Sequence, residues 1–248
     1  MTRSPAGDQL PLEFTPAASR LPDRIVPMRP TEGAGPFDDP GYFFEPWWPG
    51  IRAFVLVEGG SVRLRAEALG DPLPAFPELA EVARLVRSDG VVLDATLMVL
   101  DARGRPSRTL LERRLRGDRP ADRPRGEREA PPAPGTQAGG RGSAAMVASD
   151  LLYLDGDSLA HRPFAERRGE LAALLRPSSW CLAGRGCIGD GTTVATGRGA
   201  LGFRALSARR LDARLRAGPA HDAWYRVPVT AAPRELPPVL ALLRRLPL

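Results

Sequence analysis

Apolar and polar residues along the chain form patterns that predict several β-strands. Residues 52–66, RAFVLVEGGSVRLRA, place two apolar stretches around Glu-Gly-Gly, which is typical of a β-hairpin. Residues 90–106 carry an apolar run closed by a turn around Gly104, which predicts a buried strand. Residues 146–156 and 223–229 are also predicted to be strands, the first of them followed by a turn.

Apolar residues at helical spacing predict helices between these strands. Residues 76–88 have this spacing after a Pro-containing start, and residues 163–176 place three leucines on one side. Residues 235–248 are predicted to form a short apolar helix at the end of the chain. Because strands and helices do not alternate in a regular βαβ rhythm, the pattern predicts an α+β fold.

Two stretches of the chain differ from the rest in composition. Residues 1–24 are predicted to be a loosely ordered lead-in that packs on a domain without forming one. Residues 116–145, rich in Arg, Pro and Gly, have almost no apolar side chain larger than alanine and are predicted to be a disordered insert. The apolar elements on each side of the insert are too few for separate cores. One domain over 25–229, followed by a helical tail at 230–248, is therefore expected.

The basic residues of the chain are all of one type. The net charge is +6, and the printed sequence contains no lysine, so all 35 basic residues are arginine. Arginine stays protonated and cannot act as an amine nucleophile. An arginine-rich stretch, residues 103–128, is either a non-specific nucleic-acid contact or a solvated linker.

Other residue types narrow the class of protein. The chain has two cysteines and two histidines, Cys181, Cys187, His161 and His221, so a zinc site is not favoured. Two ordinary thiols are expected, with a local disulfide as the alternative. The first residues lack the apolar core of a signal peptide, and no apolar run approaches the roughly 18 residues of a membrane span. We therefore expect a cytoplasmic protein without a membrane partner.

Six segments follow one another in an order that resembles a known family. They are VPMRP (26–30), GYFFEPWWPGIRAF (41–54), FPELAEVARL (76–85), VVLDATLMVLDARGRPS (91–107), DLLYLDGDSLAHRPFAERRGELAALL (150–175) and ALGFRALSARRLDARLRAG (200–218). The order resembles the nucleotidyltransferase domain of ATP-dependent DNA ligases, particularly the bacterial end-joining type, over roughly residues 25–229. The resemblance implies two packed antiparallel sheets with flanking helices. The OB-fold domain of such ligases has no counterpart in the printed sequence.

The resemblance also implies a chemistry against which individual residues can be compared. In that family a lysine amine attacks the α-phosphate of ATP, and the AMP then passes to a DNA 5′-phosphate. The reaction needs a nucleophile with a free lone pair, carboxylates that hold Mg²⁺, and cations that neutralise phosphate. ATP and Mg²⁺ are thus the cofactors of this chain only if the family activity persists, and otherwise none is expected.

The nucleophile motif, Lys-x-Asp-Gly-x-Arg in the family, has changed its reacting groups. Trp47 stands at the lysine position and Pro49 at the aspartate position, whereas Gly50 and Arg52 are kept. The next motif has Glu67 where the family has arginine. The carboxylate and amine groups of this part of the site are therefore missing, while the frame of the turn remains.

The later motifs have changed in the same way. Thr96 stands at the position of a metal-side glutamate, and Ser149 at that of the aromatic residue that stacks on adenine. Arg204 and Arg209 stand at the glutamate and lysine positions of Glu-Gly-Val-Val-Ala-Lys, and Arg226 replaces the first lysine of Trp-x-Lys-x-Lys. No residue is assigned as catalytic, and no metal site is expected.

These substitutions lead to two hypotheses about the former site. We hypothesise that Trp47 fills the nucleotide pocket, which would otherwise be a costly cavity. A structure with an open pocket and Trp47 in solvent would contradict this. Arg52, Arg204, Arg209 and Arg226 are candidates for binding phosphate or DNA, with solvated or paired surface arginines as the alternative.

Several functions remain open at this point. The first is a catalytically degraded ligase homologue, or pseudoenzyme, that binds DNA or a nucleotide in DNA repair and recombination. The second is a protein-interaction scaffold for repair or end-joining proteins. The third is residual ATP-dependent ligase activity with a nucleophile other than lysine, and the fourth is a gene product without a selected function.

Overall fold

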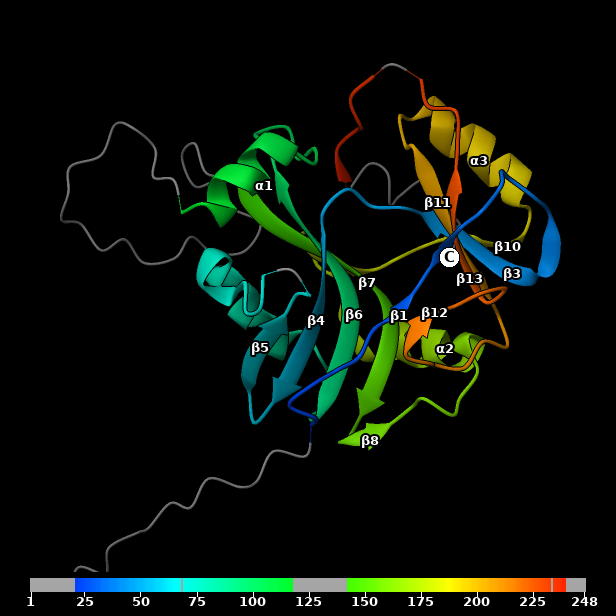
Figure 1. Ribbon diagram of the computed structural model, residues 1–248. Coiled ribbons are helices and arrows are strands. Elements are labelled where there is room, and N and C mark those ends of the chain that lie inside the picture. The colour runs from blue at the N-terminus through cyan, green and yellow to red at the C-terminus, as the bar shows by residue number, and fades with distance from the viewer. Residues whose placement is uncertain (1–20, 68, 118–141, 233, 240–248) are drawn as a thin grey trace, which may run out of the picture.

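The structure, a computed structural model, describes residues 21–67, 69–117, 142–232 and 234–239. Two mainly antiparallel β-sheets form its frame (Figure 1). The larger sheet has the order β5-β4-β6-β7-β8, with β9 added parallel to β7. Its strands are β4 (Ile51–Glu58), β5 (Ser61–Arg65), β6 (Val91–Leu100), β7 (Ser143–Leu154), β8 (Asp157–Ser158) and β9 (Cys181–Ala183).

The smaller sheet has the order β10-β3-β11-β13-β2, and its last pair is parallel. Its strands are β2 (Thr31–Glu32), β3 (Asp39–Pro46), β10 (Cys187–Gly189), β11 (Ala205–Arg210) and β13 (Trp224–Pro228). A separate parallel pair joins β1 (Met28–Arg29) to β12 (Gly218–Pro219). Figure 1 shows this pair in front of the region between the two sheets.

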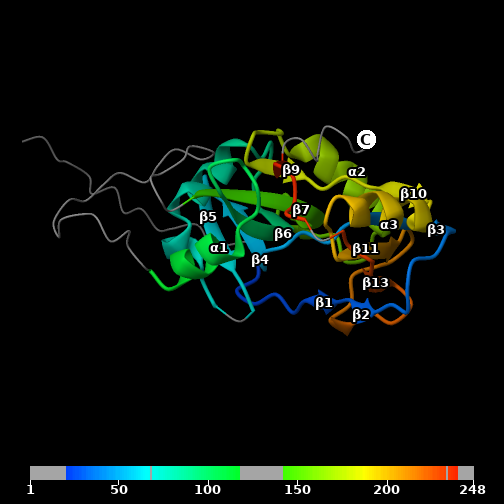
Figure 2. The same ribbon diagram turned by 90° about the horizontal axis from the view of Figure 1, so that it is seen from above.

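Three α-helices and two 3₁₀ helices accompany the sheets. They are η1 (Leu73–Ala75), η2 (Pro77–Arg84), α1 (Arg108–Leu115), α2 (Phe164–Leu174) and α3 (Gly191–Ala200). Figure 2 shows α2 on the side of the molecule opposite to β1 and β2. None of the described helices is long and apolar enough to span a bilayer.

Both faces of the larger sheet are buried, and this explains its nearly continuous apolar strands. On β4, Val55 and Val57 belong to the main core, which η2 and α2 help to form, whereas Phe54 and Leu56 face a smaller cluster with Leu152. Successive side chains of a strand point to opposite faces, so β4 supplies both clusters. The predicted α+β fold with two mainly antiparallel sheets is confirmed.

The predicted hairpin is confirmed, and its turn has the backbone that glycine favours. β4 and β5 pair from Phe54–Arg65 to Glu58–Ser61, and Gly59 and Gly60 have φ values of 57° and 71°. Two successive positive φ values are typical of a type I′ turn, which suits the twist of a hairpin.

The segment predicted as a helix at 76–88 is instead 3₁₀-helical over Pro77–Arg84. Phe76, Leu79 and Val82 are fully buried and follow one another at intervals of three residues. This interval matches the three residues per turn of a 3₁₀ helix, so the buried positions stay on one side. The helix predicted at 163–176 is confirmed as α2.

The structure corrects two predictions around the arginine-rich stretch. Residues 103–128 are not all loop, because α1 begins after Ser107, whose hydroxyl accepts a hydrogen bond from the Leu110 amide at 3.3 Å. Residues 143–145 of the predicted insert belong to β7, where their small side chains are buried against β6. Residues 118–141 of the insert lie outside the described residues, as does most of the lead-in.

The helix α3 was not predicted, and the terminal helix is largely untested. The α3 sequence, GTTVATGRGA, is rich in Gly and Thr, which have low helix propensity, so packing against β3 and β11 must stabilise it. Of the predicted helix at 235–248, residues 235–238 are not helical, and 240–248 lie outside the described part.

Candidate functional site

A small cavity lies where the two sheets meet, at the positions of the altered motifs. Its volume is about 50 Å³, which suffices for a few water molecules but lies far below the roughly 300–1,000 Å³ of ligand pockets. Strands β3, β11 and β13 of the smaller sheet and β4, β6 and β7 of the larger sheet contribute to its wall. The polar and aromatic residues that line it are Glu45, Trp47, Trp48, Arg52, Asp94, Thr96, Ser149, Ser207 and Trp224.

The three tryptophans form the aromatic part of this wall. Trp47 is half-buried, and its ring centroid lies 6.4 Å from that of Trp224. The Trp47 amide donates to the Ala205 carbonyl at 3.1 Å, which fixes the residue beside β11. Trp48 is buried and packs edge to face on Phe203 at 5.3 Å. Trp47 thus covers the cavity and does not extend into solvent, as the pocket-filling hypothesis requires.

The turn after the tryptophans keeps its glycine for a packing reason. A Cβ atom on Gly50 would lie 2.2 Å from the Leu97 carbonyl oxygen, so β4 can start beside β6 only if residue 50 has no side chain. Pro49 is exposed and does not line the cavity. The retained glycine therefore preserves the frame, whereas the neighbouring positions could change.

Arg52 and Asp94 form a pair on the floor of the site. The Arg52 guanidinium donates from Nε and Nη2 to the two Asp94 oxygens at 2.8 and 2.6 Å, and from Nη1 to the Met28 carbonyl at 2.7 Å. It also lies 4.9 Å from the Trp224 ring centroid. Burial opposes the charged form, but the neighbouring Asp94 raises the pKa of Arg52 overall. Arg52 is thus held by internal partners.

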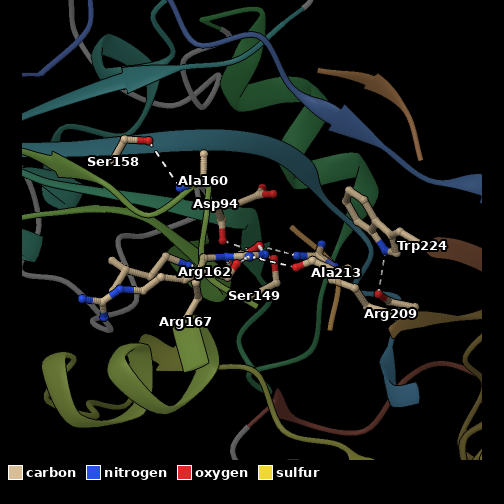
Figure 3. Close-up of polar contacts among 12 residues, drawn as sticks. Asp94, Ser149, Ser158, Ala160, Arg162, Arg167, Arg209, Ala213 and Trp224 are labelled. Carbon is tan, nitrogen blue, oxygen red and sulfur yellow. Dashed lines mark hydrogen bonds and ion pairs between the residues drawn. The ribbon is translucent and has the colours of Figure 1, made fainter. Parts of the chain in front are cut away.

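A second group, the buried charge cluster, consists of Asp150, Arg167 and Arg209. Arg167 donates to both Asp150 oxygens, at 2.9 and 2.8 Å, and Arg209 donates to one of them at 2.6 Å. All three side chains are at most 2% exposed. Figure 3 shows Arg167 also reaching the carbonyl of Ala213, to which it donates at 3.0 Å. The cluster joins β7, α2 and β11.

Arg209 is further held by aromatic rings. Its guanidinium carbon lies 3.8 Å from the Trp224 ring centroid and 4.8 Å from that of Phe164. The Trp224 indole in turn donates to the Ser207 hydroxyl at 2.9 Å. Burial lowers the pKa of Arg209, while Asp150 opposes this change. Two of its nitrogens, Nε and Nη2, are buried without a partner among the described residues.

Glu45 is a second buried group with an incomplete set of partners. It is 3% exposed, lines the cavity, and its Oε2 atom has no hydrogen-bond partner in the described part of the chain. Burial raises the pKa of the Glu45 carboxyl, against the opposing effect of Arg168 and Arg209. The buried indole nitrogen of Trp48 also lacks a described partner. Both groups belong to the cavity wall, where water can satisfy them.

Of the remaining predicted site residues, two line the small cavity and two form ion pairs away from its wall. Thr96 and Ser149 line the cavity, and the Ser149 hydroxyl donates to the Asp94 carbonyl at 3.2 Å (Figure 3). Arg226 lies 5.6 Å from the Trp47 ring centroid and pairs with Glu32 at 3.2 Å. Glu67 is exposed and pairs with Arg29.

The four arginines that were candidates for phosphate binding do not form one open cleft. Arg52, Arg209 and Arg226 gather around Trp47 and Trp224, but each is already paired with an acid. Arg204 is exposed and lines a different groove together with Arg234. This geometry agrees with paired arginines for three of the four positions.

The sequence analysis missed Glu45, Asp150 and Arg167 as members of the site. A signal was present, because Asp150 is the one charged residue of a mostly apolar strand, and a buried carboxylate requires a cationic or hydrogen-bonding partner. The sequence does not say which of 35 arginines supplies it. Among the described residues, no group of three or more His, Cys, Asp or Glu side chains is arranged to bind a metal ion.

Comparison with known proteins relates this geometry to DNA ligases. The chain is 29% identical over 206 residues to the multifunctional non-homologous end joining DNA repair protein LigD of Mycobacterium tuberculosis. It is 32% identical over 181 residues to a probable DNA ligase of Anaeromyxobacter. Among solved structures, a mycobacterial DNA ligase D complexed with ATP superposes with a TM-score of 0.61 and 26% identity. No family model matches the chain.

The matched regions differ in extent between the proteins. They cover 82% of this chain but 24% of LigD, and 72% of this chain but 32% of the Anaeromyxobacter protein. In the solved structure, the match covers 82% of this chain and 60% of the other. The chain therefore spans about a quarter to a third of the length of these two sequence relatives.

Proposed function

Because the chain is homologous to LigD ligase domains and to ATP-dependent DNA ligases, we propose that it binds DNA in end joining or repair without attaching AMP to itself. The observation that carries the proposal is the site itself. Trp47 stands where the resembling family has its lysine, and the cavity beside it is about 50 Å³. A nucleotidyl-transfer site needs both a nucleophile and a pocket of several hundred Å³.

The residues present do not fit ATP and a divalent metal. Thr96 supplies a hydroxyl where a carboxylate is needed. Both carboxylate oxygens of Asp94 already accept hydrogen bonds from the Arg52 guanidinium. Glu45 is buried against arginines and has a raised pKa, so it is a poor ligand for a hydrated Mg²⁺ ion. No step that uses ATP is therefore assigned to this chain.

The absence of lysine supports the same proposal chemically. Arginine remains protonated at physiological pH and has no free lone pair, so none of the 35 basic side chains is suited to form the phosphoramidate bond to AMP. DNA binding needs only cations that reach phosphate oxygens, and arginine serves this purpose well.

The first test separates catalysis from binding. The purified chain is incubated with ATP and Mg²⁺ and its intact mass measured, with a mycobacterial LigD ligase domain as the positive control. We expect the control to gain the mass of AMP and this chain to keep its own. A stable AMP adduct on this chain would overturn the proposal.

The second test measures binding to a nicked and an intact DNA duplex over a series of salt concentrations. We expect binding that weakens linearly on a log–log plot as salt increases, because phosphate contacts release counterions. A preference for the nicked duplex would indicate retained ligase-like recognition. If the chain binds neither duplex at low salt, the DNA proposal fails, and a protein partner in end joining becomes the function to test.

A further inference from the structure

A second, larger cavity lies beside the Arg52–Asp94 pair and is lined differently. Its volume is about 190 Å³, and Arg52 and Asp94 border both this cavity and the smaller one. Its apolar lining includes Phe54, Leu152 and the half-buried Tyr153. The volume lies below the roughly 300 Å³ at which pockets for whole small molecules begin, so the cavity suits one planar ring.

The loop that follows β11 forms one rim of this cavity and continues into a neighbouring groove. Leu215 and Arg216 line both hollows, and Arg214 lines the groove. Ala213 is buried, Leu215 is half-buried, and Arg214 and Arg216 are exposed. The alternation directs the two arginines outward while their neighbours pack inward.

The loop is fixed at three points, so it presents its arginines from a defined position. The Ala213 carbonyl accepts from the buried Arg167, and Figure 3 shows the two residues in contact. The Leu215 amide donates to the Ala160 carbonyl at 3.1 Å, and the Gly218 amide donates to the Pro27 carbonyl at 2.9 Å. A rigid support reduces the entropy lost when a side chain binds its ligand.

The arginines of this rim differ from Arg52, Arg209 and Arg226 in having no acidic partner among the described residues. Arg24, Arg214 and Arg216, which we call the arginine ridge, are exposed and form no ion pair with the described residues. Of the described residues that line the two hollows, the acidic ones are Asp94 and Asp212. Each of these is already paired, with Arg52 and Arg210 respectively. The ridge therefore carries uncompensated positive charge.

We propose that the arginine ridge binds the backbone of a single-stranded DNA end and that the adjacent cavity receives one unpaired base. The inference rests on the proposed DNA-binding function. Guanidinium groups without an ion-pair partner among the described residues suit phosphate oxygens, and an aromatic and apolar hollow beside them suits a base face. A duplex keeps its bases stacked, so only an overhang or a frayed end can use the cavity.

The experiment measures affinity for a duplex with a single-stranded overhang and for a blunt duplex of equal charge. Three proteins are compared with the unmodified chain: Arg214→Gln/Arg216→Gln, Tyr153→Leu, and the control Arg84→Gln/Arg176→Gln. The control also removes two positive charges, from the exposed residues Arg84 at the end of η2 and Arg176 just after α2. The Arg176 amide donates to the Leu85 carbonyl, which places the two control positions near each other. Circular dichroism melting confirms that each variant is folded.

We expect the unmodified chain to prefer the overhang by about fivefold or more, which is the effect of one stacked base. Arg214→Gln/Arg216→Gln should lower affinity about tenfold for the overhang and reduce the salt slope by about two, one for each lost phosphate contact. Tyr153→Leu should reduce the preference for the overhang and leave blunt-duplex affinity unchanged.

Two outcomes would overturn the inference while leaving the proposed function intact. One is equal affinity of the ridge variant and the control variant in the presence of clear DNA binding. The other is equal affinity of the unmodified chain for overhang and blunt duplex. If the unmodified chain binds no DNA at low salt, the proposed function fails as well, so the two failures are distinguishable.

Discussion

The buried charge cluster and the arginine ridge use the same side chain in opposite ways. Arg167 and Arg209 are enclosed, share Asp150, and stack on aromatic rings. Arg214 and Arg216 lie a few residues further along the chain from Arg209 but face solvent, and within the described part of the chain they have no acidic partner. The comparison teaches that an arginine at a position matching a family motif is not by itself a binding residue, because its partners decide whether its charge is available.

The largest effect should follow from removing the acid of the buried charge cluster. Asp150→Asn keeps the side-chain shape but leaves two buried guanidinium groups without a counter-charge, which should lower the free energy of unfolding by about 3–5 kcal/mol. Urea unfolding measures this loss. Glu32→Gln, which breaks the more exposed pair with Arg226, is the control and should cost less than about 1 kcal/mol. Similar losses in both variants would remove the distinction between buried and exposed arginines.

A smaller loss of free energy of unfolding should follow from removing the Trp47 ring, which lines the small cavity. A fully buried tryptophan costs about 3–5 kcal/mol on truncation to alanine, and Trp47 is half-buried, so Trp47→Ala should cost about 2 kcal/mol. The change also removes the contacts of Trp47 with Trp224 and Arg226. Thermal and urea unfolding measure the effect. A variant as stable as the unmodified chain would contradict the hypothesis that Trp47 fills the space beside the small cavity.

The pH dependence of the free energy of unfolding should show that burial disfavours the charged form of Glu45 more than the nearby arginines favour it. Burial raises its pKa above the unfolded value, so the folded state holds the proton more tightly. Its contribution to the free energy of unfolding is therefore greatest below the unfolded pKa and falls as pH rises through the folded pKa.

Glu45→Gln should remove this fall, and its stability relative to the unmodified chain should increase from acidic to neutral pH. The groups that act on Glu45 are Arg168, Arg209, Asp150 and Asp94. Urea unfolding between about pH 4 and pH 7 gives the comparison, with Glu67→Gln as an exposed control. A difference between Glu45→Gln and the unmodified chain that stays constant over this range would contradict the assignment.

The smallest effect on stability is expected at the ridge. Arg214→Gln removes an exposed charge that has no ion-pair partner among the described residues, so the free energy of unfolding should change by less than about 0.5 kcal/mol. The same urea unfolding measurement applies. A loss of 2 kcal/mol or more would mean that Arg214 is structural, and the comparison between the two regions would then fail.

Much of the fold could be predicted from sequence because the determining patterns are local. The Glu-Gly-Gly turn of the β4–β5 hairpin and the leucines of α2 depend on residues close together in the chain. The helix α3 could not be predicted in this way, since its Gly- and Thr-rich sequence disfavours a helix and its stability comes from β3 and β11. The start of β7 at Ser143 was also missed, because its first residues are small and resemble the preceding insert.

The candidate site was predictable as a set of positions but not as a set of interactions. The motif order identified Trp47, Thr96 and Ser149, and all three line the small cavity. Whether an arginine at such a position is open or paired depends on contacts between strands distant in sequence. Arg209 was a candidate for phosphate binding with a paired arginine as the alternative, and its partner Asp150 lies 59 residues away on β7. The ridge could not be recognised for the same reason, because it combines Arg24 with the loop after β11.

The parallel pairing of β1 with β12 has a consequence for the order in which the chain folds. Met28 and Gly218 lie opposite each other although about 190 residues separate them. Contacts between such distant segments close the largest loops, so we expect them to form after hairpins such as β4–β5. The loop that carries Arg214 and Arg216 is fastened to this pair, so the ridge is among the last surfaces to assemble. We therefore expect a partly folded chain to present Arg24 apart from Arg214 and Arg216 and not yet as a joint surface.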